Sequence, residues 1–93
     1  MITISILGLD QYMVGTYSEE HTQKISDLYE VKTSEVNFYA PNSFYFHEGI
    51  DQTSWNVLVR IHAPFECAAL EEKMTTYLFK TLKAMAIHIS VEY

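Results

Sequence analysis

The chain has 93 residues, the size of one domain, and its twelve acidic and six basic residues give a formal net charge of −6. It contains no basic stripe and no basic amphipathic segment, so we expect neither nucleic acid nor a membrane surface as a partner. Cys67 is the single cysteine and cannot form an internal disulfide. Without a signal-peptide pattern or a membrane-spanning apolar run, the sequence predicts a cytoplasmic protein.

The first third of the chain predicts a strand followed by a helix. Residues 2–7 alternate apolar and polar side chains with the period of two that is typical of a β-strand. Gly8 ends this strand, and Asp10 is a candidate N-cap. From about Gln11 to Tyr29 apolar positions recur at helical spacing, which predicts an amphipathic helix. Its apolar stripe comprises Val14, Tyr17, Ile25 and Leu28, with His21 at the boundary of the core.

The middle of the chain is rich in residues that favour strands. After a connector over residues 31–36, residues 37–49 predict a second strand, in which Pro41 marks an edge or a break. Residues 49–54 predict a turn of hairpin length. Residues 55–63 form the clearest strand pattern. One face of that strand presents Trp55, Val57, Val59 and Ile61, and the other presents Asn56, Leu58, Arg60 and His62.

The last third predicts a helix and a final strand. Pro64 stops the preceding strand and begins a helix whose apolar stripe runs through residues 66–86. The strand over residues 87–93 points Ile87, Ile89 and Val91 inward. The order β-α-β-β-α-β predicts an α+β fold of two layers, with four main strands and both helices on one face. The sequence predicts a single domain, 1–93, with similar halves over about 1–49 and 50–93.

The second face of the predicted sheet is neither apolar nor fully charged. Because both helices pack on the apolar face, this mixed face must meet either water or another subunit. Its aromatic, histidine and leucine content favours contact with another copy of the chain, and a solvated face is the alternative. The mixed face comprises Thr3, Ser5, Leu7, Tyr45, His47, Asn56, Leu58, Arg60, His62, His88, Ser90 and Glu92.

The pattern resembles a known superfamily. An opening strand, a helix, the run "FYFHEG", the strand "WNVLVRIHA", a long helix and a last strand resemble the tautomerase superfamily, the group of 4-oxalocrotonate tautomerase and macrophage migration inhibitory factor. The likeness is strongest to a small uncharacterised bacterial family, whose second strand ends in an aromatic-x-aromatic, acidic, glycine run. The resemblance implies two βαβ halves related by a pseudo-twofold axis. It also implies a trimer whose sheets surround a central channel.

The resemblance also identifies a catalytic group that this sequence lacks. Active members of the superfamily use an N-terminal proline as general base. Here Ile2 follows Met1, and a residue this bulky should block removal of the methionine. We therefore expect no proline-dependent tautomerase activity, and a binding or structural role rather than an enzyme. The alternative is an isomerase that acts on a small keto or enol acid through the Met1 amine, Arg60 or His62.

Three residues are candidates for binding a ligand. Arg60 is the single arginine, and its guanidinium could hold the carboxylate or phosphate of a small anionic ligand. The favoured alternative is an ion pair with an acid such as Glu92. Tyr39 and Tyr45 stand in the aromatic run 37–46, which could line a pocket or form core and subunit contacts.

Metal and cofactor chemistry is not favoured. His47, His62 and His88 could share the mixed face with Glu92, but they lie on separate predicted elements without ligand spacing, so we expect no metal and no cofactor. Cys67 is best explained as a small buried filler. A third reading is a ferredoxin-like module, dimeric through its sheet, that binds a small metabolite. Strand order separates the two folds, because a ferredoxin-like sheet inserts its third strand between the first and second.

Overall fold

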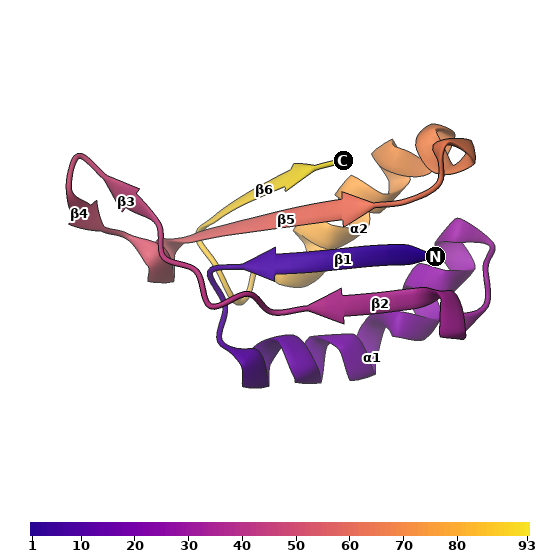
Figure 1. Cartoon of the computed structure of the whole chain (residues 1–93), viewed down its shortest axis with the longest axis horizontal. Helices are drawn as coiled ribbons and strands as arrows, with labels where there is room; N and C mark the ends of the chain where they lie inside the picture. Colours follow the sequence, from indigo (N-terminus) through magenta and orange to yellow (C-terminus); the bar gives the residue numbers. More distant parts are fainter.

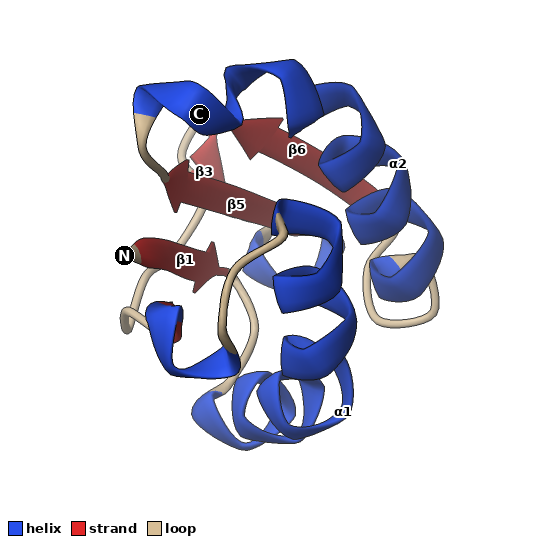
Figure 2. Cartoon of the chain, turned by 90° about the vertical axis from the view of Figure 1, so that its right-hand side faces the viewer, coloured by secondary structure: helices blue, strands red, loops and turns tan.

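A mixed four-stranded sheet forms the centre of the molecule, and two helices cover one of its faces (Figures 1 and 2). The computed structural model describes residues 1–93, except for the side chain of Ser54. The predicted α+β fold is confirmed. The sheet has the order β2-β1-β5-β6, from β2 (Val36–Tyr39), β1 (Ile2–Leu7), β5 (Asn56–His62) and β6 (His88–Glu92). The helices are α1 (Gln11–Tyr29) and α2 (Glu71–Leu82).

Strand directions give the sheet an internal pseudo-symmetry. β1 pairs with β2 in parallel, β5 pairs with β6 in parallel, and β1 and β5 run antiparallel at the centre. Each half is therefore a strand, a helix and a parallel strand. Because β2 lies directly beside β1, the ferredoxin-like alternative is wrong for this chain.

The core lies between the helices and one face of the sheet. The alternate residues of the two central strands that the sequence placed inward are buried, as are Val14, Tyr17 and Ile25 of α1. Tyr17 packs edge-on against Phe38 of β2. The buried strand residues are Ile2, Ile4, Ile6, Val57, Val59 and Ile61, and α2 adds Met74, Leu78 and Leu82.

The link between β1 and α1 depends on a glycine and a cap. Gly8 adopts φ 101°, and a Cβ at this position would lie 2.4 Å from the backbone oxygen of Asn56. Asp10 caps α1 as expected, because its carboxylate accepts a hydrogen bond of 2.9 Å from the Met13 N–H. α1 ends at Tyr29, and its C-cap residue Glu30 takes the left-handed conformation.

The segment between the two halves differs from its prediction. β2 ends at Tyr39, before Pro41, and the expected continuous strand is replaced by a separate hairpin of β3 (Phe46–His47) and β4 (Ile50–Asp51). The turn falls at Glu48–Gly49, both with positive φ, rather than over residues 49–54. Positive φ at both central residues is the requirement of a type I′ hairpin turn. The hairpin projects beyond the sheet (Figure 1).

Two side chains predicted to face inward are exposed. Trp55 lies in the 3₁₀ turn Thr53–Trp55, ahead of β5, and is 55% exposed. Ile87 precedes β6 and is 66% exposed. The second helix is also shorter than predicted, because Phe65–Leu70 form a 3₁₀ helix and α2 ends at Leu82. Among the described residues, no helix combines the length and apolar composition needed to span a membrane.

Candidate functional site

The sheet face opposite the helices, here called the open face, places residues of different strands in rows. Tyr39, Ser5, Arg60 and Glu92 form one row across all four strands, because Ser5 pairs with Tyr39 and Arg60, and Arg60 pairs with Glu92. The next row contains Leu7, Leu58 and Ser90. At the other end, Thr3 separates Asn37 from His62.

Arg60 is held by an acid of the neighbouring strand. Its Nε donates to the Glu92 carboxylate, which is the ion pair that the sequence favoured over an anion clamp. Both side chains are about half exposed, so water screens the pair. A small anion would have to compete with Glu92 for the guanidinium, which weakens the case for Arg60 as a ligand-binding residue.

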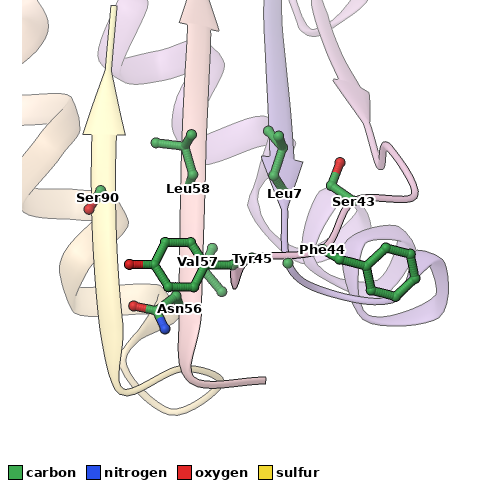
Figure 3. Close-up of a pocket in the computed structure, with 9 residues that line it drawn as sticks. Leu7, Ser43, Phe44, Tyr45, Asn56, Val57, Leu58 and Ser90 are labelled. Atoms are coloured by element: carbon green, nitrogen blue, oxygen red, sulfur yellow. The ribbon is translucent and has the colours of Figure 1, made fainter. Parts of the chain in front are cut away.

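A pocket of about 280 Å³ opens beside the row of Leu7, Leu58 and Ser90. Ser43 and Tyr45 close one side, and Figure 3 shows the Tyr45 ring projecting over β5 while the Phe44 ring turns away. Leu7 and Leu58 supply an apolar wall, and Asn56 and Ser90 supply polar groups. Tyr45 is thus the sequence-predicted ligand residue that the structure places at a pocket.

Hydrogen bonds hold the loop that carries Tyr45. The Tyr45 N–H donates to the Thr53 hydroxyl at 2.9 Å, and the Gln52 N–H donates to the Tyr45 carbonyl at 2.8 Å. The Asn56 side-chain amide donates to the Gln52 carbonyl oxygen at 3.0 Å. Among the described side chains, no charged group lines this pocket, so its chemistry suits a neutral ligand with an apolar body better than an anion.

Met1 and His62 lie far from this pocket. His62 pairs with Thr3 at the start of β1, whereas the pocket adjoins Leu7 at its end. At about 3.3 Å per strand residue, Met1 and Leu7 are roughly 20 Å apart. The catalytic candidates Met1 and His62 therefore occupy one end of the open face, Arg60 its middle and Tyr45 the other end.

The histidines and the cysteine are dispersed. His47 is on the hairpin, His62 ends β5 and His88 begins β6 opposite Asn56, and among the described side chains no three potential metal ligands gather. Cys67 is half-buried and lines a small pocket with Tyr29 and Tyr93 instead of filling the core. Burial raises the pKa of the Tyr29 hydroxyl.

A polar cluster joins the two helices. His21 Nδ1 lies 2.5 Å from the Tyr77 hydroxyl, and the Tyr17 and Thr81 hydroxyls are 2.7 Å apart. Thr81 donates its proton to the Tyr77 carbonyl, so Tyr17 donates to Thr81. Burial raises the pKa of Tyr17 to about 12. This cluster is internal packing between α1 and α2, which agrees with the boundary position expected for His21.

No protein-family model and no curated protein matches the sequence. Solved structures do match. A macrophage migration inhibitory factor-like protein from Entamoeba histolytica aligns with a TM-score of 0.73 and 12% identity over 98% of this chain and 84% of its own. A domain of unknown function (DUF1904) from Sebaldella termitidis aligns at 0.68 and 14% identity, over 99% and 87%.

A third match extends the comparison to an enzyme family. N1, a member of the cis-3-chloroacrylic acid dehalogenase family, aligns with a TM-score of 0.57 and 11% identity over 97% of this chain and 74% of its own. At these identities the likeness concerns the fold. The chain has a tautomerase and macrophage migration inhibitory factor-like fold, and the resemblance expected from its sequence is confirmed.

Proposed function

We propose that this chain is a homo-oligomeric binding or structural protein of tautomerase-like fold, a trimer in the bacterial cytoplasm, without proline-dependent tautomerase activity. The observation that carries the proposal is the exposed apolar surface of the β3–β4 hairpin. Phe46 is 60% and Ile50 is 62% exposed, and Phe44 and Trp55 beside the hairpin are also exposed. Phe46 and Ile50 lie on opposite faces of the hairpin, because Phe46 pairs with Asp51 and Ile50 pairs with His47. Exposed apolar side chains on both faces of a projecting hairpin are typical of a protein contact.

The hairpin also lacks a third strand within the described chain. β3 pairs with β4, and neither joins the four-stranded sheet. Two-stranded hairpins are marginally stable in water unless they pack against other structure. A neighbouring copy that packs on either face of the hairpin, against Phe46 or against Ile50, would supply that packing. The open face, which neither helix covers in Figure 2, supports the same reading, because the paired residues Leu7 and Leu58 lie on it.

The start of β1 supports a non-catalytic role. Where the superfamily uses a proline as general base, β1 begins with Ile2, whose side chain is buried in the core. The pocket beside Tyr45 gives the assembly a place to bind a small neutral molecule. An isomerase that uses Met1, Arg60 or His62 gains no support from their spread along the open face.

Analytical ultracentrifugation tests the assembly. The wild-type chain should sediment with the mass of three chains, and Phe46→Ser with Ile50→Ser should shift it toward one chain while circular dichroism keeps the fold signal. Tyr12→Ser is the matched control, since Tyr12 is an exposed aromatic on α1. A wild-type chain that stays monomeric at high concentration would refute the proposal, and a dimer would refute the trimer.

A further inference from the structure

A small hollow of about 210 Å³ lies where the last turn of α1 meets the 3₁₀ helix Phe65–Leu70, at the end of β5. Figure 1 shows the end of β5, this 3₁₀ helix and the end of α1 at the same end of the molecule. Tyr29, Cys67 and Tyr93 line the hollow, and we call it the thiol hollow. It is separate from the pocket beside Tyr45, which opens at the other end of β5.

A buried hydroxyl of the thiol hollow lacks a hydrogen-bond partner. Tyr29 is 3% exposed, and its hydroxyl makes no hydrogen bond within the described chain. Buried polar groups in proteins are almost always hydrogen-bonded, because an unpaired group loses the bonds that it makes with water. Burial raises the pKa of this hydroxyl, and the nearby Tyr93, Cys67 and Glu71 raise it further, so it keeps its proton at neutral pH. These three neighbours line the hollow, so the hydroxyl lies beside it as a donor without an acceptor.

The polar groups around Tyr29 do not satisfy it. The Tyr93 hydroxyl donates to the Glu71 carbonyl oxygen at 2.8 Å and lies 2.5 Å from the Thr75 hydroxyl oxygen. Cys67 forms no disulfide, and its side chain is half-buried. Within the described chain none of these groups accepts a hydrogen bond from Tyr29. A bound molecule with an oxygen acceptor would complete the hydrogen bonding of this hydroxyl.

The lining of the thiol hollow restricts the class of that molecule. Ile61, Ala63 and Pro64 supply apolar walls, and among the described residues Glu71 is the one charged group that lines the hollow. Because a carboxylate repels an anion, a neutral carbonyl oxygen is the acceptor that suits the Tyr29 hydroxyl. The hollow is smaller than the sites that hold drug-sized ligands, which limits the molecule to a few non-hydrogen atoms. The thiol in its wall adds a nucleophile.

We propose that the thiol hollow takes a small, neutral α,β-unsaturated carbonyl compound, which Cys67 captures covalently. The Tyr29 hydroxyl donates to the carbonyl oxygen, and the Cys67 sulfur forms a bond to the β-carbon. As this bond forms, the carbon–carbon π electrons shift toward the carbonyl and give an enolate, whose oxygen the Tyr29 hydroxyl stabilises. The proton of the thiol passes through water to the α-carbon. The product is a saturated thioether, so the step needs no oxidant or reductant, and the proposal does not depend on the oligomeric function.

Intact-protein mass spectrometry after treatment with cyclohex-2-enone tests the capture. The wild-type chain should gain the mass of one cyclohexenone, and Cys67→Ser should gain none. Tyr29→Phe should slow the addition at least about tenfold, because the enolate oxygen loses its donor. This variant should keep the fold, since it removes a buried hydroxyl that has no partner within the described chain. Methyl methanethiosulfonate modifies thiols without a carbonyl group, so its rate at Cys67 should differ less than about threefold between the wild type and Tyr29→Phe.

Ala69→Cys in the Cys67→Ser background is the matched control, because Ala69 is exposed in the same 3₁₀ helix and does not line the hollow. Its reaction with cyclohexenone should be the same with and without Tyr29→Phe. Equal cyclohexenone rates at Cys67 in the wild type and Tyr29→Phe, or an equal loss at both positions, would overturn the proposal. A methanethiosulfonate rate that falls as far as the cyclohexenone rate would also overturn it, because Tyr29 would then only position the thiol.

Discussion

Arg60 and Glu92 face each other across β5 and β6 and form an ion pair on the open face. Their exposed fractions, 52% and 54%, leave the pair in contact with water. Exposed pairs of this kind contribute about 0–1 kcal/mol. The pair therefore contributes little to the free energy of unfolding.

A double-mutant cycle measures that contribution. Arg60→Ala, Glu92→Ala and the double variant should give a coupling energy below about 1 kcal/mol in denaturant unfolding, and the coupling should shrink as salt is added. A coupling of about 3 kcal/mol would show that the pair is shielded from water, as burial in a subunit interface would achieve. The cycle should therefore be measured at a concentration where the association state is known.

Arg60 also offers a test of the enzyme alternative. The protein should show no keto–enol conversion of phenylpyruvate above the buffer rate, because Arg60 is paired with Glu92 and Ile2 at the start of β1 has a buried hydrocarbon side chain that cannot accept a proton. Ultraviolet absorbance of the enol provides the measurement. Turnover that disappears in Arg60→Ala would contradict this expectation and identify an isomerase.

The periodicity of apolar residues correctly predicts the first strand and the first helix. The strand over residues 2–7 and the helix from Gln11 to Tyr29 agree with the structure, as does the Arg60–Glu92 pair. The alternation of apolar and polar residues predicts β5 and β6 to be longer than they are. The pattern continues past the residues at which the pairing of the two strands stops. The ladder of β5 and β6 begins at Asn56 and His88, so Trp55 and Ile87 lie just outside it.

The pocket is formed by residues that lie far apart in the sequence, so the periodicity of neighbouring residues could not predict it. Tyr45 is recognisable from the aromatic run, but Leu7, Asn56 and Ser90 come from three different strands. A second sequence signal is the presence of Leu7 and Leu58 on a face of mixed character. The β3–β4 hairpin could not be predicted from its turn residues, because Glu48 stands at the first turn position. Type I′ turns prefer asparagine, aspartate or glycine there.

Gly8→Ala should destabilise the protein by about 2–3 kcal/mol. The residue has φ 101°, and the added methyl would meet the Asn56 carbonyl oxygen at 2.4 Å, a backbone atom that cannot move freely. Thermal unfolding gives the measurement. Gly15→Ala is the matched control, because Gly15 lies within α1 with open space around it, and it should be neutral or stabilising. Equal effects at the two glycines would contradict the close approach at Gly8.

Glu30→Gly should stabilise the protein by about 0.5–1 kcal/mol. Glu30 ends α1 in the left-handed conformation with φ 57°, which glycine adopts without strain. The change also removes a negative charge from the negative end of the helix dipole. Urea unfolding provides the measurement, and Glu19→Gly inside the same helix should have the opposite sign. Loss of stability in Glu30→Gly would indicate that the glutamate side chain makes a stabilising contact.

Tyr17 should make the protein sensitive to alkali. Burial raises the pKa of its hydroxyl to about 12, whereas a tyrosine in an unfolded chain loses its proton near pH 10. Between these values the unfolded chain has released a proton that the folded chain retains. The stability from protonated Tyr17 is therefore fully present below about pH 10 and is lost as the pH rises toward 12.

Tyr17→Phe should flatten this decline in the free energy of unfolding between pH 10 and pH 12. At neutral pH the variant should be less stable by about 1 kcal/mol, because the hydrogen bond from Tyr17 to Thr81 is lost. Tyr12→Phe, which removes a hydroxyl from an exposed ring of the same helix, is the matched control. Urea unfolding at several alkaline pH values tests the expectation. Identical slopes in the wild type and Tyr17→Phe would show that the buried hydroxyl does not retain its proton in the folded chain.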